Sequence, residues 1–305
     1  MRINVVVITY NGSQFIERCV ESLLKYFLEE EITIVDNNSS DNTIELVETL
    51  FPNVKIIINQ ENLGFGSACN IGCHSVDSNL VMFVNQDSKF VSIDKTSIYS
   101  LFDNGRIGLM GGRVLGISGS DIDSVGRGLS PSTIFAHWLF LPLSFLGITY
   151  FQMVEAGKPP LSDVQWVNGH VMIVDKSSFN EVGGFDESFF MYVEEVDLCY
   201  RMRDAGYKVV FSSDVSSIDY NPSRNGLGGL SELAVHHSLL GHGIFTTKRH
   251  GFFVGITVRT LSSLASIVWG ICSTPLFILN RAHGRSSISL IRGGFRGLLG
   301  LSRNQ

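Results

Sequence analysis

Short apolar runs alternate with amphipathic segments over the first third of the chain. The apolar runs are rich in β-branched residues, which is typical of buried strands, and the segments between them carry apolar residues at helical spacing. The expected strands are residues 3–9, 32–35, 54–58 and 80–84. Three helices are expected between them: the first begins after Ser13, which serves as its N-cap, and the others lie at 40–50 and 65–76. Strands that alternate with helices predict an α/β fold with a mostly parallel sheet covered on both faces.

Polar clusters follow three of these strands directly: Thr9-Tyr10-Asn11, Asp36-Asn37-Asn38 and Asn85-Gln86-Asp87. In a parallel sheet the carboxyl ends of the strands meet at one edge, where ligands bind. Asp87 is suited to a divalent ion that also grips a diphosphate, and Asp36 is suited to a nucleobase edge. Both can instead be turn or capping residues, and Tyr10 can stack on a base or simply pack.

The loop ENLGFGSACNIG resembles a dinucleotide-binding fingerprint in part. Gly64 and Gly66 have the GxG spacing, but Cys69 stands at the third glycine position. The loop also follows the third strand, whereas the fingerprint normally follows the first strand of its unit. We therefore disfavour an NAD-linked oxidoreductase and expect these glycines to let a ligand approach the backbone closely.

The densest group of carboxylates is Glu194, Glu195 and Asp197, which follow an aromatic run. Acidic residues are favoured in the first turn of a helix by the helix dipole, and that is the structural interpretation. The functional interpretation is that like charges beside an apolar wall raise the pKa of one carboxyl and make it a general base. The local sequence leaves both open.

The distribution of charged residues changes after residue 232. The chain carries 23 Lys+Arg and 29 Asp+Glu, a net charge of −6, but residues 233–305 hold 8 of the basic residues and none of the acidic ones. Such a distribution argues against nucleic acid as a partner and for a tail that meets an anionic surface.

Two uncharged stretches are candidates for contact with lipid. Residues 260–279 are long enough to span a membrane, but serines and a proline dilute them and arginines flank both sides. We expect this segment to lie in the membrane interface, with a span or a protein-packed helix as alternatives. Residues 133–154 predict either a buried hairpin of the core or a lipid-facing surface.

Cysteines and the N-terminus indicate the compartment. The five cysteines form no CxxC pair, so we expect buried small apolar residues rather than a metal site, even for Cys69 and Cys73. The N-terminus enters a strand pattern directly, without the apolar region of a signal peptide. We therefore expect a reducing, cytoplasmic location for the body of the protein.

Taken in order, five segments resemble the family 2 glycosyltransferases, which have the GT-A fold. The segments are VVVITYNG, VDNNSSDNT, NLGFGSACNIG, FVNQDS and WVNGHVMIVDKSSFNEVGGFDESFFMYVEEVDLCYR. The resemblance implies a GT-A domain over residues 1–250, with a nucleotide-binding half at 1–105 and an acceptor half at 106–250. Residues 251–305 are then a basic, apolar, helical extension that associates with a membrane.

The resemblance also implies roles for particular residues. Asp87 stands at the metal motif, for Mg²⁺ or Mn²⁺, and Glu195 at the catalytic-base position, with Glu194 and Asp197 beside it. The residues implied for the nucleotide sugar are Thr9, Tyr10, Asn11, Asp36, Asn38, Asn62, Gly64, Asn70 and Asn85. The residues implied for the acceptor are Trp166, Gly169, His236 and His237, although both histidines can instead be helix-surface residues. A histidine that the family often has near position 219 is absent, and Asp219 stands there.

Within the family the chain resembles bacterial rhamnosyltransferases of cell-wall and O-antigen synthesis. This implies an inverting transfer of L-rhamnose from dTDP-rhamnose, or of a sugar from a UDP-sugar, to a saccharide linked to polyprenyl diphosphate. The enzyme would be peripheral, on the cytoplasmic face of the inner membrane. A non-catalytic nucleotide-sugar-binding subunit remains the alternative, and the oligomeric state stays open.

Overall fold

The computed structural model covers the whole chain and describes residues 1–104, 106–122, 124–126, 128–140, 161–221, 231–273 and 281–300. The chain divides into two compact units. Unit 1 consists of Met1–Arg127, Met153–Glu187 and Glu195–Tyr220, and unit 2 of Gly128–Gln152, Ser188–Glu194 and Asn221–Gln305. The predicted domain boundary at residue 250 stays a prediction, and the helices on either side of it belong to the same compact unit.

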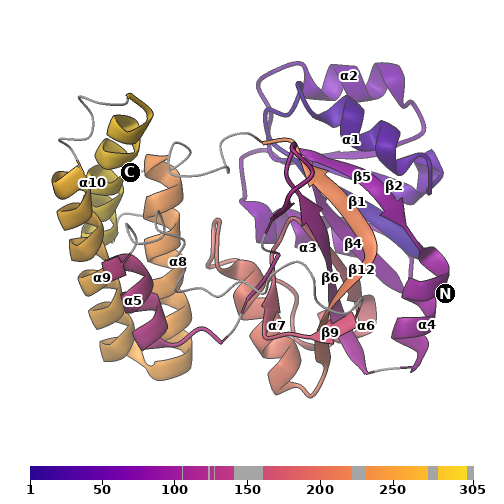
Figure 1. Cartoon of the computed structure of the whole chain (residues 1–305). Helices are drawn as coiled ribbons and strands as arrows, with labels where there is room; N and C mark the ends of the chain where they lie inside the picture. The colour runs from indigo at the N-terminus through magenta and orange to yellow at the C-terminus, as the bar shows by residue number, and fades with distance from the viewer. Residues whose placement is uncertain are drawn as a thin grey trace. The chain divides into compact units, whose positions relative to one another are not determined.

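Unit 1 is an α/β body (Figure 1). Its strands are β1 (Ile3–Thr9), β2 (Ile32–Asp36), β3 (Lys55–Ile58), β4 (Leu80–Asn85), β5 (Ser88–Ile93), β6 (Ile107–Leu115), β7 (Asp121–Ile122), β8 (Val125–Gly126), β9 (Leu161–Asp163), β10 (Trp166–Val167), β11 (Val171–Asp175) and β12 (Lys208–Asp219). Its helices are α1 (Ile16–Leu23), η1 (Glu29–Glu31), α2 (Thr43–Leu50), α3 (Phe65–Ser75), α4 (Lys95–Asn104), α6 (Lys176–Glu181) and α7 (Glu194–Asp204), whose first residue is assigned to unit 2.

The main sheet has the strand order β3-β2-β1-β4-β11-β6-β12-β5. The first four strands run parallel, as predicted, and β12 is parallel to β6. Strand β11 is antiparallel to both of its neighbours, and β5 is antiparallel to β12 at the sheet edge. The register aligns Thr9 with Asp36 and Ile8 with Asn85, so the three polar clusters meet at one edge, as the sequence predicts.

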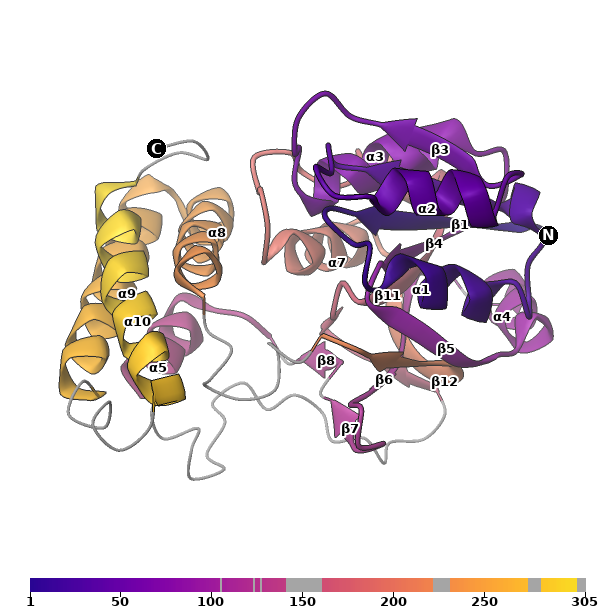
Figure 2. The same ribbon diagram turned by 90° about the horizontal axis from the view of Figure 1, so that it is seen from above.

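Helices cover both faces of the parallel half (Figure 2). Val5 and Val7 of β1 point into the core that α1 and α4 close. Val6 points to the other face, where α3 packs so closely that a Cβ on Gly72 would lie 2.2 Å from Val6 Cγ1. A strand buried on both faces is apolar on both of them, which explains the continuous run VVVI at residues 5–8.

The strands and helices predicted between residues 3 and 84 are confirmed within a few residues at their ends, whereas η1 and β5 were not predicted. The prediction that Ser13 caps the first helix is wrong, because α1 begins at Ile16 and no side chain caps its Phe15 N-cap. The Ser13 amide instead donates to Asp41 Oδ2 at 3.1 Å. Four of the cysteines are buried as expected, whereas Cys272 is exposed, and all five are free thiols.

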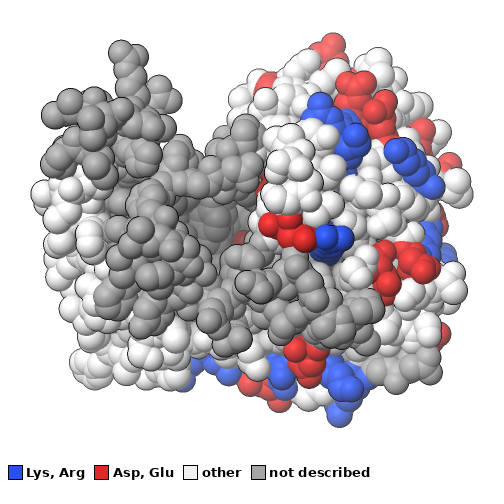
Figure 3. All heavy atoms as spheres, in the orientation of Figure 1, with Lys and Arg blue, Asp and Glu red and all other residues white. Residues whose placement is uncertain are grey.

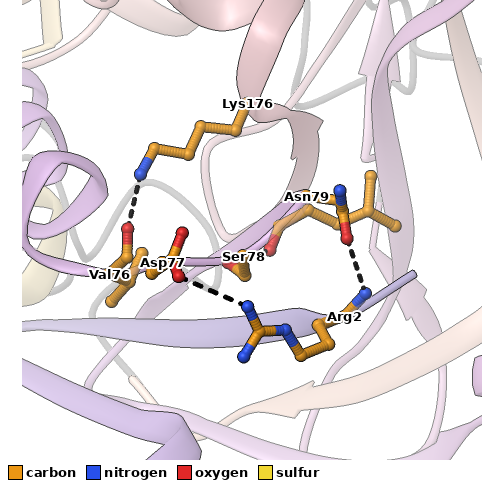
Figure 4. Close-up of polar contacts among 7 residues, drawn as sticks. Arg2, Val76, Asp77, Ser78, Asn79 and Lys176 are labelled. Carbon is orange, nitrogen blue, oxygen red and sulfur yellow. Dashed lines mark hydrogen bonds and ion pairs between the residues drawn. The ribbon is translucent and has the colours of Figure 1, made fainter.

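The amino-terminal edge of β1 and β4 is closed by polar contacts (Figure 4). The Arg2 amide donates to Asn79 Oδ1 at 3.0 Å, and the Lys176 ammonium donates to the Val76 carbonyl. The Arg2–Asp77 ion pair is exposed on both sides and contributes little to stability. The functional candidates lie at the opposite edge of the sheet, where the carboxyl ends of the parallel strands meet.

Unit 2 is helical, with α5 (Pro131–Phe140), α8 (Glu232–His250), α9 (Phe252–Ser273) and α10 (Arg281–Leu299). Small residues let α9 and α10 approach closely: a Cβ on Gly270 would lie 2.8 Å from the Ser287 carbonyl oxygen, and Ser266 Oγ donates to the Leu290 carbonyl at 2.9 Å. Among the described residues α9 is the helix long and apolar enough to cross a membrane, by length and composition alone. Of the uncharged stretches, 141–154 and 274–279 lie outside the described residues.

Candidate functional site

Gln86 binds the loop after β1 to the end of β4. Its Oε1 accepts from Thr9 Oγ1 at 2.5 Å and from the Tyr10 amide at 2.9 Å, and its Nε2 donates to the Tyr10 carbonyl at 3.1 Å. A Cβ on Gly12 would lie 2.1 Å from Gln86 Oε1, so a larger residue there would displace the Gln86 side chain from these hydrogen bonds. Thr9 is buried, while the Tyr10 side chain is 46% exposed and is available for stacking.

The second polar cluster is held by its own hydrogen bonds. Asp36 is buried and accepts from both the amide and the hydroxyl of Ser39, at 2.8 and 2.5 Å. Asn11 and Asn38 adopt left-handed conformations, with φ of 48° and 65°, which asparagine tolerates better than most residues. The Asn11 amide donates to Ser39 Oγ at 2.8 Å, so the loops after β1 and β2 are joined.

Asn37 connects the same loops to the start of α3. Its Nδ2 donates to the Gly64 carbonyl at 3.0 Å, and its Oδ1 accepts from Asn59 Nδ2 at 2.9 Å. Gly64 precedes α3 with φ of 83°, and its amide donates to Asn62 Oδ1 at 3.0 Å. Asn62 and Gly64 therefore belong to the same edge as Thr9 and Asp36, as the predicted pocket requires.

The side-chain amide of Asn70 makes hydrogen bonds with the backbone of unit 1. Its Oδ1 accepts from the Phe185 amide at 2.8 Å, and its Nδ2 donates to the Phe185 carbonyl at 2.9 Å. This pair of bonds holds the segment before the acidic cluster against α3. The predicted contact of Asn70 with a nucleotide sugar stays a prediction, and its observed contacts are structural.

Asp87 meets two further potential ligands, His170 and Asp219. Their ligand atoms all lie within 4.8 Å of one another, and His170 Nδ1 is 3.9 Å from both Asp87 Oδ1 and Asp219 Oδ2. All three side chains are buried, with 6%, 1% and 3% of their surface exposed in the order Asp87, His170, Asp219. The pairing of the strands produces the cluster. Asp87 follows β4, His170 precedes β11, which is antiparallel to β4, and Asp219 of β12 pairs with Ser88, the residue after Asp87.

The imidazole of His170 is oriented toward the carboxylates. Its Nε2 lies 3.0 Å from Ser88 Oγ, and its backbone amide donates to Asn168 Oδ1 at 2.9 Å. Asp87 Oδ1 is fully buried and has no hydrogen-bond partner within the part of the chain that the structure describes. Two buried carboxylates and an imidazole so arranged fit a divalent cation.

The acidic cluster begins helix α7, so its carboxylates do lie in a first helical turn. Asp197 is buried and accepts from Arg201 Nε at 2.6 Å, and Arg201 also donates to the Val182 carbonyl at 2.7 Å. Glu194 is buried, whereas Glu195 is partly exposed. Of the three carboxylates, Glu195 is therefore the one with access to a substrate.

Gly169 lies beside Glu195. A Cβ on Gly169 would be 3.8 Å from the Glu195 Cβ and 3.4 Å from Phe65. Trp166 is buried in β10, and its ring occupies the space over Gly126 of β8 that a side chain there would fill. The structure thus places Gly169 next to the predicted base and Trp166 in the packing against β8.

His236 and His237 lie on α8 in unit 2. They are buried, so the interpretation as helix-surface residues is wrong. Their ring centroids are 4.9 Å apart, and the His237 ring is 4.8 Å from that of Phe190. The predicted contact of these histidines with an acceptor stays a prediction.

The sequence reasoning missed Gln86, Asn37 and His170 as site residues, and it noted Asp219 only as a replacement. Gln86 and Asn37 stood inside the quoted polar clusters, so their position was a usable signal. His170 carried no local signal, because a histidine before a buried strand is ordinary until the strand order is known.

The chain is similar to known proteins in sequence and in fold. Residues 4–151 match the family model described as Glycosyl transferase family 2. The chain is 30% identical over 268 residues to the N-acetylglucosaminyl-diphospho-decaprenol L-rhamnosyltransferase of Mycobacterium tuberculosis, across 81% of this chain and 84% of that protein.

Two solved structures have a similar fold. The mannosyltransferase PcManGT from Pyrobaculum calidifontis, in complex with GDP-Man and Mn²⁺, gives a TM-score of 0.55 at 13% identity, over 99% of this chain and 88% of that chain. GalNAc-T7 with UDP, GalNAc and Mn²⁺ gives 0.54 at 14% identity, over 82% of this chain and 50% of that chain. Both were solved with a nucleotide or nucleotide sugar and Mn²⁺.

Proposed function

The chain belongs to glycosyltransferase family 2, and from this premise we propose that it transfers L-rhamnose from dTDP-rhamnose to a saccharide linked to polyprenyl diphosphate. The predicted GT-A-type fold and the predicted enzyme class, a glycosyltransferase, are both confirmed. The specific sugar and acceptor rest on the mycobacterial relative, whose name states a rhamnosyl transfer to a decaprenyl-diphosphate-linked N-acetylglucosamine.

The observation that carries the proposal is the cluster of Asp87, His170 and Asp219 at the carboxyl edge of the sheet. Nucleoside-diphosphate leaving groups bear negative charge, and buried carboxylates alone would repel them. A divalent cation held by these three residues would neutralise the departing diphosphate. The imidazole ligand leads us to propose Mn²⁺ as the ion, with Mg²⁺ as the weaker alternative.

Glu195 is the proposed general base. It is partly exposed, it lies beside Gly169, and its neighbour Asp197 is bound to Arg201. In an inverting single displacement Glu195 removes the proton of an acceptor hydroxyl as that oxygen attacks the anomeric carbon. The longer side chain of glutamate, where the family usually has aspartate, extends the reach of the carboxylate by one methylene.

The nucleoside is proposed to bind at the loops that Gln86 and Asn37 connect. Tyr10 offers an exposed ring for the base, and the fixed loops of Asn11 and Asn38 present their backbones at the same edge. Because the hydrogen bonds of Gln86 and Asn37 already fix these loops, binding would require little ordering of the protein.

The membrane surface is the proposed location of the acceptor. On α9 most exposed side chains are apolar, and they include Phe253, which is 81% exposed, Leu264 and Val268. The visible described atoms of unit 2 are nearly free of charge (Figure 3). The helix before α9 ends with Lys248 and Arg249, and no acidic residue follows Glu232. An apolar face with basic residues nearby suits peripheral binding to the anionic cytoplasmic leaflet.

The experiment is a panel of sugar nucleotides assayed with a polyprenyl-diphosphate-linked N-acetylglucosamine acceptor, with product mass as the readout. We expect a mass gain of one deoxyhexose with dTDP-rhamnose, dependent on Mn²⁺, and none in the Glu195→Gln variant. Nucleotide binding without transfer to any acceptor would support the alternative of a non-catalytic subunit. Transfer from other sugar nucleotides only would refute the assignment of rhamnose.

A further inference from the structure

The segment that leads into the proposed base belongs to unit 2. Ser188–Glu194 forms part of that unit, and the chain returns to unit 1 at Glu195. Phe189 and Val193 in this segment are buried, whereas Met191 and Tyr192 are partly exposed. The backbone immediately before the base is therefore packed by a different set of helices from the backbone that follows it.

Two consecutive residues of the segment adopt left-handed backbone conformations. Tyr192 has φ of 68° and Val193 has φ of 73°. This region is disfavoured for a side chain other than glycine and most of all for a β-branched one such as valine. Such a conformation persists only where the surrounding structure holds it.

One face of helix α8 contacts the segment and holds Tyr192 and Val193 in this backbone conformation. Gly241 lies so close that a Cβ there would be 2.7 Å from the Tyr192 carbonyl oxygen and 3.0 Å from Val193 Cγ2. One turn earlier, the His237 ring lies 4.8 Å from the Phe190 ring. Two turns later, the Lys248 ammonium lies 5.9 Å from the Phe189 ring centroid. Residues at these spacings share one side of a helix.

We infer that this face of α8 positions the general base, with Gly241 as the positioning residue. The inference rests on the proposed function, because it takes Glu195 to be the base. Gly241 lets the Tyr192 carbonyl approach α8 closely, and the contact keeps Tyr192 and Val193 in conformations that they would otherwise leave. Val193 directly precedes α7, and the first residue of that helix, Glu194, also belongs to unit 2, so the contact holds the backbone at the start of the helix that carries Glu195. The unit with the exposed apolar face of α9 thus also holds the segment that leads into the base.

The test is Gly241→Ala, with Gly243→Ala as the matched control. Both substitutions add one methyl group to the interior of α8, but a Cβ on Gly243 meets the Arg259 side chain at 3.1 Å instead of the segment that leads into the base. We expect Gly241→Ala to lower kcat roughly 10- to 100-fold, the effect of a catalytic group displaced by about 1 Å. The affinity for nucleoside diphosphate should stay unchanged, because that site is built from unit 1. Gly243→Ala should keep the wild-type kcat.

Equal kcat values for the two variants would overturn the inference, and so would a parallel loss of kcat and nucleotide affinity in Gly241→Ala. Phe190→Leu weakens a second contact of the same segment with α8, that of Phe190 with His237, and should show the same split between kcat and affinity, so it replaces Gly241→Ala if that variant does not fold. Full turnover in Glu195→Gln would instead refute the proposed base itself. Loss of turnover in Glu195→Gln with wild-type kcat in Gly241→Ala would overturn only the positioning role.

Discussion

Replacing Asp219 with Asn should make the metal-free protein more stable while weakening its response to metal. Asp87 and Asp219 are both buried, and their ligand atoms lie within 4.8 Å of each other. Two unit charges at that separation repel by about 3 kcal/mol at an effective dielectric constant of about 20. A proton on His170, whose Nδ1 lies 3.9 Å from each carboxylate, would offset part of that repulsion. We therefore expect a gain of about 1–2 kcal/mol in the free energy of unfolding.

Metal should reverse the difference in the free energy of unfolding between Asp219→Asn and wild type. An ion that binds only the folded protein stabilises it by about 2.7 kcal/mol when its concentration is a hundred times its Kd. The amide that Asp219→Asn introduces is a neutral and weaker ligand, so the same Mn²⁺ concentration should stabilise the variant much less. Turnover should fall with it, because the leaving diphosphate loses part of its countercharge.

Urea unfolding of wild type and variant, in chelator and in Mn²⁺, measures both effects in one experiment. Asp77→Asn is the control, because it removes a carboxylate from an exposed ion pair and should change neither value appreciably. A variant less stable than wild type in chelator, with an undiminished gain from Mn²⁺, would refute the reasoning that these carboxylates repel each other and share an ion.

Three further predictions concern the rest of the molecule. Gly72→Ala should lower the free energy of unfolding by about 1–3 kcal/mol in urea, because its Cβ would lie 2.2 Å from Val6 Cγ1, and an unchanged midpoint would contradict this. Burial lowers the pKa of His242 from 6.5 to about 3 and the pKa of His137 from 6.5 to about 4. As the pH falls below about 6.5, these histidines are therefore protonated in the unfolded chain but not in the folded protein. Stability should then fall by about 1.4 kcal/mol per pH unit for each histidine, and melting curves of His242→Gln between about pH 7 and 5 should show a shallower slope than wild type. Phe253→Glu should reduce flotation with anionic liposomes, and binding that is equal on neutral liposomes and insensitive to salt would favour a spanning helix instead.

The sequence by itself determined the parallel half of the fold and where its site lies. A strand buried on both faces has to be apolar throughout, so the runs of β1, β2 and β4 could be read directly. Parallel strands end at a common edge, so the order of strands and helices along the chain was enough to expect Thr9, Asp36 and Asp87 together. The carboxylates of α7 were also evident, because they are neighbours in the chain.

Only the tertiary structure decided which of these residues are available and what completes the metal site. Asp197 is bound to Arg201, and Asn70 to the backbone of Phe185, through contacts that no local pattern indicates. His170 and Asp219 reach Asp87 because β11 enters the sheet antiparallel beside β4, and because β12 ends where the chain of Asp87 begins β5. Pairing between strands far apart in sequence depends on the packing of the whole sheet, and a local pattern of residues does not contain it.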